Sequence, residues 1–438
     1  MKLISFIIFI EILLLQLSCK SHTSEKKDES TIDIKRTSFY FNELNKALTK
    51  ENGKLWNYRL DGPIILVDKK SRKVYANTQD SKGELLRRGD VFIGTLPENV
   101  NISSTAKEWN GTRWAMLAMP VPEEKEERLS AFIHESFHRI QPSIGFDSIP
   151  RYSCEHLDKK NGRIYLKLEL EALEKALNTN NPTEEKEHIM NALLFRQYRH
   201  SLFPNSKIYE NPLELNEGLA EYTGIILCGR KDIKLRQYFV SRIELFYNLP
   251  TFVGAYAYFT IPVYGYFMYR QDKHWNLKID KRTNLSDFFS AFFNQSKFVN
   301  IQKAIEQISQ EYHFETIVNE EEKREKNQQY LIEKYKTVFL KDSILNIKLI
   351  NKRISFNPGN LIPLEDYGTI YPTLRLVDIW GVLTVDSGAL INTDRSKIII
   401  SKPLFVKDTV ILGNGWKINL NNSWSLVKDS SEYTLKKK

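Results

Sequence analysis

The apolar pattern changes twice along the chain, and this change constrains the fold more than any other feature. Residues 37–122 carry short apolar runs at strand-like spacing, such as "GPIILVD" and "DVFIGTL". Residues 123–335 place apolar side chains three and four positions apart, as in helices that bury one face. Short strand-like runs return in residues 342–438. Strands and helices that are segregated in this way predict an α+β protein.

This pattern predicts two folded domains. Residues 37–335 form the larger one, with an N-terminal β-sheet packed on a mainly helical region, and residues 342–438 form a small all-β domain. Asn110 followed by glycine is a strong hairpin signal. Asn181 and Asn211 are each followed by proline, and an N-cap residue before a first-turn proline predicts the start of a helix.

The N-terminus has the pattern of an export signal. Lys2 precedes an apolar run that reaches Leu17, and a small residue then stands before Cys19. Residues 1–19 therefore resemble a bacterial lipoprotein signal peptide, which implies cleavage before Cys19 and a lipid on that cysteine. An ordinary secretory signal is the alternative. Either interpretation predicts an exported chain, and the first predicts a membrane-anchored lipoprotein on the periplasmic or cell-surface side.

The segment after the signal is polar and charged. Residues 20–36 contain too little apolar surface to fold alone, so we expect a tether. Two further cysteines follow, Cys154 and Cys228. An oxidising compartment permits a disulfide between them, but two unpaired core cysteines agree equally well with the sequence.

The composition argues against nucleic acid as a partner. The 438 residues carry a net charge of +9, but the lysines and arginines are scattered, with no basic block that contains interleaved aromatic residues. The excess charge is typical of a lysine-rich solvated surface. No pattern in the sequence indicates an oligomeric state.

The segment "HESFH" is the strongest functional signal. His134 and His138 are four residues apart on a predicted helix, so both imidazoles share one face and can hold one ion. Glu135 follows the first histidine and suits a general base, as in the HExxH pattern of zinc hydrolases. The alternative is a pair of partly buried histidines without a metal.

A catalytic zinc site of this kind needs a third protein ligand. Position 144 is Ile144, which excludes the third histidine of the metzincins, and Asp147 lacks a suitable setting. The segment "ELNEGLAEYTG" is a better candidate, and here the chain resembles the gluzincin metallopeptidases. The resemblance implies that Glu217 is the third zinc ligand and that Glu221 supports a ligating histidine.

The resemblance covers residues 105–225 and has two departures. Glu217 follows His138 by 79 positions, more than in thermolysin-like enzymes, and two predicted helices fill the interval. The GxMEN motif of the aminopeptidase N family is absent from the sequence, so nothing supports an aminopeptidase.

Other polar residues have competing interpretations. Tyr258 and Tyr264 are the best candidates to donate to the oxyanion formed on hydrolysis, with core packing as the alternative. Glu169 and Glu171 are alternative ligands, although surface charges fit them better. Five further residues fit solvated surface positions: His156, His188, His200, Arg196 and Arg199. The two arginines could alternatively bind a substrate carboxylate.

The sequence as a whole predicts an exported, lipid-anchored zinc metallopeptidase that cleaves a peptide or protein substrate. His134, His138 and Glu217 would hold Zn²⁺, and Glu135 would act as base and acid. Two alternatives are a zincin-like binding protein without turnover and a surface-anchoring protein with a structural metal.

The lipoprotein prediction has a direct test. Mass spectrometry of the mature N-terminus should show an acylated Cys19 as the first residue, because the apolar run ends immediately before it. A mature chain with a free N-terminus beyond residue 19 would leave only the ordinary secretory signal.

Overall fold

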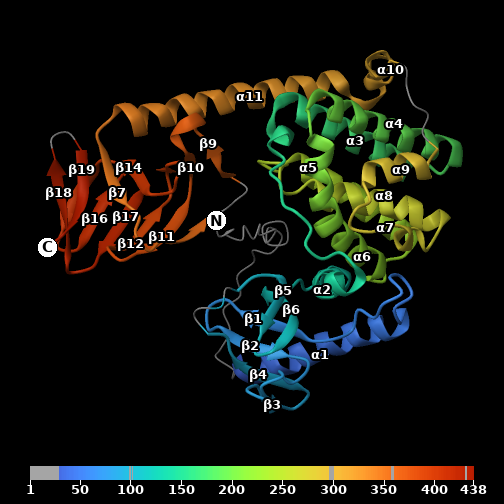
Figure 1. The fold of residues 1–438 in the computed structure, drawn as a ribbon, viewed down its shortest axis with the longest axis horizontal. Coiled ribbons are helices and arrows are strands. Elements are labelled where there is room, and N and C mark those ends of the chain that lie inside the picture. The colour runs from blue at the N-terminus through green and yellow to red at the C-terminus, as the bar shows by residue number, and fades with distance from the viewer. Residues whose placement is uncertain (1–28, 98–99, 101, 295–299, 357–359, 430–431) are drawn as a thin grey trace. The chain divides into compact units, whose positions relative to one another are not determined.

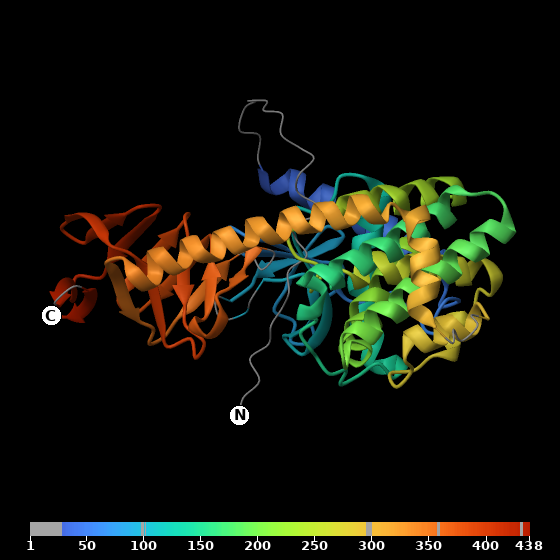
Figure 2. The ribbon, with the colours of Figure 1, turned by 90° about the horizontal axis from the view of Figure 1, so that it is seen from above.

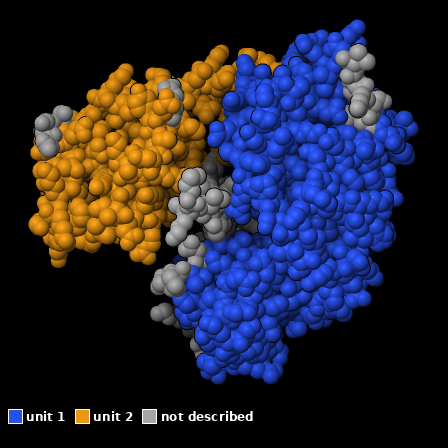
Figure 3. Space-filling model, viewed as in Figure 1, with its two compact units in different colours: residues 1–248, 252–317 blue, residues 249–251, 318–438 orange. Residues whose placement is uncertain are grey.

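The computed structural model describes residues 29–97, 100, 102–294, 300–356, 360–429 and 432–438. The chain divides into two compact units, which Figure 3 shows in different colours. The first contains residues 1–248 and 252–317, and the second contains residues 249–251 and 318–438. Cys19 and the predicted signal peptide lie outside the described residues. No helix within the described ranges combines the length and the apolar character needed to cross a bilayer.

The first unit begins with helix α1 and a mixed six-stranded sheet (Figure 1). The strand order is β3-β4-β2-β1-β6-β5, and within this sheet only the pair β1–β6 is parallel. Strand β6 leads directly toward α2, so the sheet fixes where the HESFH helix begins. The elements are α1 (Glu29–Glu51), β1 (Ile64–Asp68), β2 (Lys73–Ala76), β3 (Leu86–Arg88), β4 (Val91–Thr95), β5 (Thr105–Trp109) and β6 (Thr112–Met119).

The rest of the first unit is helical. Helix α3 packs along α4, and α2 packs against α6 and against the strands β5 and β6 at one side of the sheet. The helices are α2 (Lys125–Ile140), α3 (Lys160–Asn178), α4 (Pro182–Leu202), α5 (Ser206–Leu213), the π-helical turn η3 (Glu214–Gly218), α6 (Leu219–Leu227), α7 (Asp232–Tyr247), α8 (Ala257–Gln271), α9 (Leu285–Phe292) and α10 (Ile301–Ile308), with the short 3₁₀ turns η1 (Gln141–Ile144), η2 (Glu155–Asp158), η4 (Trp275–Lys278) and η5 (Ser309–Tyr312).

A glycine sets the distance between α2 and α6. A Cβ atom on Gly224 would stand 2.5 Å from the backbone oxygen of Ser130, which no side chain tolerates. Glycine at this position therefore lets the backbone of α6 touch the backbone of α2. Helix α2 carries two candidate metal ligands, and the turn η3, which continues directly into α6, carries the third, so this contact controls the width of the site.

The second unit is a β-sandwich with a helix on one outer face. Helix α11 (Phe314–Lys336), the long helix of Figure 2, runs into this unit and ends in the π-helical turn η6 (Thr337–Lys341). Sheet B has the order β18-β19-β7-β14-β13-β10-β9, and sheet C has the order β15-β16-β17-β12-β11-β8. Apolar side chains from both sheets form a common core, including Ile347, Leu376 and Trp380.

The strands of the second unit are short. They are β7 (Ile344–Lys348), β8 (Arg353–Phe356), β9 (Ile362–Pro363), β10 (Thr369–Tyr371), β11 (Leu374–Asp378), β12 (Gly381–Val385), β13 (Ala389–Ile391), β14 (Lys397–Ser401), β15 (Pro403–Lys407), β16 (Val410–Gly413), β17 (Trp416–Leu420), β18 (Trp424–Asp429) and β19 (Glu432–Lys437), with the 3₁₀ turn η8 (Glu365–Tyr367).

The α+β class is confirmed, as are two local predictions. Asn110 and its glycine form the β5–β6 hairpin with positive φ angles, and the Asn181 side chain caps α4 by accepting from the Thr183 N–H at 3.0 Å. The helix start predicted at Asn211 is wrong. Proline follows it inside α5, and the Asn211 side chain instead accepts from the N–H of Leu285.

The structure also changes the predicted boundaries. Residues 29–36, predicted as part of a tether, belong to α1, whose later turns bury Tyr40, Leu44 and Leu48. The second compact unit contains residues 318–341, with most of α11, as well as the predicted 342–438. Cys154 and Cys228 are both buried and free, so no disulfide joins them.

Candidate metal centre

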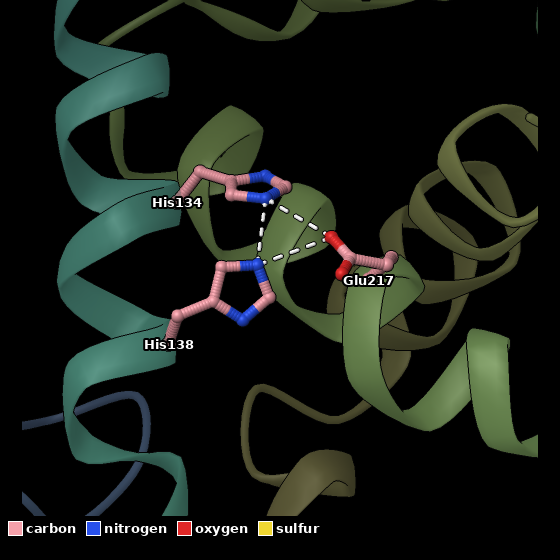
Figure 4. A group of neighbouring side chains, drawn as sticks. All are labelled: His134, His138 and Glu217. Atoms are coloured by element: carbon pink, nitrogen blue, oxygen red, sulfur yellow. Dashed lines mark hydrogen bonds and ion pairs between the residues drawn. The ribbon is translucent and has the colours of Figure 1, made fainter. Parts of the chain in front are cut away.

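Helix α2 presents two histidines to the interior of the first unit. His134 and His138 lie one turn apart and are largely buried, with 8% and 9% of their surfaces exposed. Apolar residues on the same helix, including Phe132, Ile133 and Phe137, are fully buried and hold α2 against its neighbours. Figure 4 shows both imidazoles on the same side of α2.

The third candidate ligand comes from the wide helical turn η3. Helix α5, η3 and α6 follow one another without a break, and Glu217 lies within the π-helical part. Such turns are frequent at functional sites because the extra residue changes the direction of a side chain. Figure 4 shows the Glu217 carboxylate directed at both imidazoles of α2.

Three donor atoms form a compact triangle. His134 Nε2 and His138 Nε2 are 3.0 Å apart, and Glu217 Oε2 lies 3.1 Å from His138 Nε2 and 3.5 Å from His134 Nε2. Zinc bonds of about 2.0–2.1 Å at tetrahedral angles place donors about 3.3 Å apart. The triangle thus has the size that a tetrahedral zinc ion requires.

The tautomers of the two histidines strengthen this fit. His134 Nδ1 is 2.9 Å from Glu221 Oε2, and His138 Nδ1 is 2.6 Å from Gln141 Oε1. Both Nδ1 atoms face acceptors and therefore carry hydrogens. In neutral imidazoles the two Nε2 lone pairs would then point at each other, and either a proton on one of them or a metal ion between them removes this repulsion. The residues present thus fit a zinc ion.

Two residues orient the histidines from behind. Glu221, one turn after Glu217, is itself held by Arg242 at 2.8 Å. Gln141 accepts from His138, and its Nε2 donates to the backbone oxygen of Asn216 at 2.9 Å. Gln141 therefore joins the end of α2 to the residue next to Glu217. Partners of this kind fix ring orientation and raise the basicity of a ligand.

In the metal-free site, the charges of the two histidines and of Glu217 stabilise one another. Burial opposes a charge on His134, but its bonds to Glu217 and Glu221 raise its pKa to about 10. Burial acts against the Glu217 carboxylate as well, yet the charge of His138 and the bonds to both histidines lower its pKa well below the usual range. A metal ion must therefore displace a proton from the imidazoles, so binding should strengthen as pH rises.

Glu135 is buried beside the two histidines. It is 7% exposed, and its Oε2 atom has no hydrogen-bond partner among the described residues. Burial raises the pKa of Glu135 to about 6, although the nearby histidines act in the opposite direction. This value is near neutrality, where a carboxylate is most effective at taking and returning a proton. The unpartnered oxygen is therefore free to accept a hydrogen bond from a group outside the chain.

Tyr258 lies at the same site. Its hydroxyl donates to Glu217 Oε2 at 2.6 Å, and its ring lies parallel to the His134 ring with centroids 5.9 Å apart. Burial and the Glu217 charge raise the pKa of Tyr258 well above its usual value, so the phenol remains protonated and can donate. Its backbone oxygen accepts from Arg242, which also holds Glu221.

Tyr264 does not belong to this site, and the oxyanion role predicted for it is wrong. The side chain is fully buried, and its hydroxyl donates to Glu169 Oε1 at 3.0 Å. Glu169 also accepts from Arg196 and Arg199, each at 2.6 Å. Tyr264 faces this buried ion network because it lies almost two turns after Tyr258 on α8.

The same network corrects several surface predictions. Arg196, Arg199 and Glu169 are at most 1% exposed, so none lies on a solvated helix face. His156 is also buried and His200 is half-buried, and both bond to Glu210, which accepts from Arg199. These residues balance one another's charges away from water.

His188 and Glu171 were also predicted to lie on the surface, and each pairs with another side chain. His188 is half-buried and bonds to the hydroxyl of Tyr312 at 2.7 Å. Glu171 is an ion-pair partner of His313 at 2.9 Å. Neither Glu169 nor Glu171 belongs to the donor triangle, so neither serves as an alternative ligand.

Sequence reasoning did not find Gln141 or Arg242. Gln141 lies three residues after His138, on the same side of the chain, and this spacing is the only local signal for its role. Arg242 comes from α7 and carries no signal, because its contact with Glu221 depends on how α7 packs.

Comparisons of the chain with protein-family models, with curated proteins and with solved structures find no match. Function is therefore inferred from the site itself.

The orienting role of Gln141 can be measured. Gln141→Leu keeps the volume of the side chain but removes the acceptor for His138 and the donor to Asn216. We expect zinc affinity to fall by about 10- to 100-fold while the far-ultraviolet circular dichroism stays unchanged. Gln302→Leu on exposed α10 is the matched control and should bind zinc like wild type. Equal affinity in both variants would rule out this role.

Proposed function

We propose that this chain is a zinc-dependent metallopeptidase that hydrolyses peptide bonds. The observation that carries the proposal is the donor triangle of His134, His138 and Glu217 with the buried, unpartnered Glu135 carboxylate beside it. The triangle supplies three ligands, and a catalytic zinc site keeps its remaining position for water or substrate.

The protein residues would divide the reaction among them. A bound zinc ion polarises a carbonyl and lowers the pKa of water. Glu135 takes a proton from the attacking water as the carbon–oxygen bond forms, and returns it to the amide nitrogen as the carbon–nitrogen bond breaks. In the metal-free site burial already raises the pKa of Glu135 to about 6, toward the neutral range in which a carboxylate can both take and return a proton.

Tyr258 is our candidate for stabilising the charge on the carbonyl oxygen. Its hydroxyl is next to the metal ligands and stays protonated, so it can donate once a substrate oxygen replaces Glu217 as acceptor. Arg242 would fix the position of this tyrosine through its backbone oxygen.

Two features favour an enzyme over a binding protein or a structural metal site. A structural zinc site is closed by a fourth protein ligand, and the described residues offer three donors in this group. A binding protein would have no use for a buried carboxylate with an unpartnered oxygen, which is costly to keep.

The proposal includes export and a lipid anchor. It is supported by the signal-like residues 1–19, which end at Cys19. An enzyme tethered in this way would meet peptide or protein substrates outside the cytoplasm.

Two substitutions separate catalysis from metal binding. Glu135→Gln keeps the shape of the side chain but removes its basic oxygen, so peptide hydrolysis should fall about 10²- to 10⁴-fold while zinc content stays at the wild-type level. Glu217→Gln removes a charged ligand and should weaken zinc binding by more than about tenfold. Hydrolysis of a mixed peptide library and zinc content are measured for both.

Glu244→Gln, on an exposed position of α7, is the matched control and should behave like wild type. Undiminished hydrolysis by Glu135→Gln would contradict the mechanism. Wild-type zinc affinity in Glu217→Gln would remove Glu217 from the ligand set.

A further inference from the structure

The two outer faces of the C-terminal β-sandwich differ in whether a helix covers them. The outer face of sheet B is covered by η6 and the end of α11, which bury Ile344, Ile370 and Ile399. The outer face of sheet C has no such cover from any described element of this unit, and side chains along its middle strands alternate between buried and exposed. Figure 1 labels four of its strands, β16, β17, β12 and β11.

Strand pairing places the outward side chains of sheet C in two adjacent rows. We call these two rows the C face. One row crosses all six strands through Phe405, Leu412, Lys417, Thr384, Arg375 and Ser355. The other crosses them through Lys407, Val410, Asn419, Val382, Val377 and Arg353.

The C face carries positive charge without any carboxylate. Arg353, Arg375, Lys407 and Lys417 are all exposed, and none forms an ion pair with a described acidic residue. The one acidic residue within these six strands, Asp378, is 6% exposed and accepts from the backbone N–H groups of neighbouring residues. The face is thus complementary to an anionic partner.

One end of the C face is also apolar and exposed, at the edge hairpin β15–β16. Phe405 and Leu412 of the C face are 53% and 37% exposed, and Leu404 and Val406, on the other side of the same edge strand, are 67% and 51% exposed. A strand that exposes neighbouring large apolar side chains is unusual at a sheet edge. Exposing apolar surface to water is unfavourable, so this edge fits a partner with an apolar interior.

We propose that the C face docks on an anionic phospholipid membrane, with Arg353, Arg375, Lys407 and Lys417 at the phosphate groups and the β15–β16 edge inserted among the lipids. Exposed aromatic and aliphatic side chains beside cations are typical of proteins that bind the surface of a bilayer. Basic residues near an anionic leaflet each add to binding and act within a Debye length.

Two other occupants fit the observations less well. Strand pairing with a second copy is hindered at β15, because Pro403 and the register irregularity after it interrupt the edge and Lys402 and Lys407 stand at its ends. A soluble polyanion would satisfy the cations but leave Phe405 and its neighbours in water.

The proposal can be tested by measuring how a chain that lacks the predicted lipid anchor binds lipid vesicles. Residues 20–438, the chain without the predicted signal and Cys19, should bind vesicles of phosphatidylglycerol and phosphatidylcholine at low salt and bind phosphatidylcholine alone far more weakly. The triple variant Lys407→Gln, Lys417→Gln, Arg375→Gln should lose about fivefold per cation, on the order of 100-fold in total.

A charge-matched control separates the C face from net charge. The triple variant Lys348→Gln, Lys428→Gln, Lys436→Gln removes three exposed cations from strands of sheet B and should bind vesicles like wild type. Equal losses in the two triple variants would overturn the proposal.

A second variant tests the apolar edge. Phe405→Ser with Leu412→Ser should weaken vesicle binding by at least about tenfold and leave thermal stability unchanged, because both side chains are exposed. Wild-type vesicle binding by this variant, with equally tight binding of dextran sulfate, would identify a soluble polyanion instead. A dimer in sedimentation velocity that this variant dissociates, without vesicle binding, would identify a second copy.

Discussion

The contact between the backbones of α2 and α6 at Gly224 is the constraint on which the candidate metal site depends. Candidate ligands that are 79 residues apart in sequence meet within 3.5 Å because α6 can approach α2 this closely. Gln141 then ties the end of α2 to the backbone beside Glu217. The position of the three donors is thus fixed by main-chain packing and one amide, rather than by flexible side chains.

Buried charge is balanced on both sides of this contact. Arg242 holds Glu221 on one side, and Arg196 bonds to Glu214, one helical turn before Glu217, on the other. Burial raises the pKa of Glu214 to about 7, and the Arg196 charge opposes that shift. Breaking a buried pair of this kind leaves an uncompensated charge, which costs about 3–5 kcal/mol. The helical segment that carries Glu217, the third candidate ligand, is therefore held by ion pairs as well as by apolar packing.

The sequence predicted the features that have local causes. Apolar spacing gave the strands and helices, and one-turn spacing on α2 gave the shared face of His134 and His138. Features that depend on tertiary packing were missed. Arg196 and Glu169 look like solvated helix charges because a helix pattern does not reveal that a second helix buries the polar face. Tyr264 and Tyr258 looked equivalent in sequence, yet the direction of α8 places only Tyr258 beside Glu217.

X-ray absorption at the zinc edge tests the central claim most directly. The account predicts one zinc per chain, surrounded by two imidazole nitrogens and by oxygen atoms at about 2.0–2.2 Å, from His134, His138 and Glu217 with solvent. In His138→Ala the spectrum should lose one imidazole or the metal altogether. A sulfur neighbour near 2.3 Å, or an unchanged spectrum in His138→Ala, would contradict the proposed site.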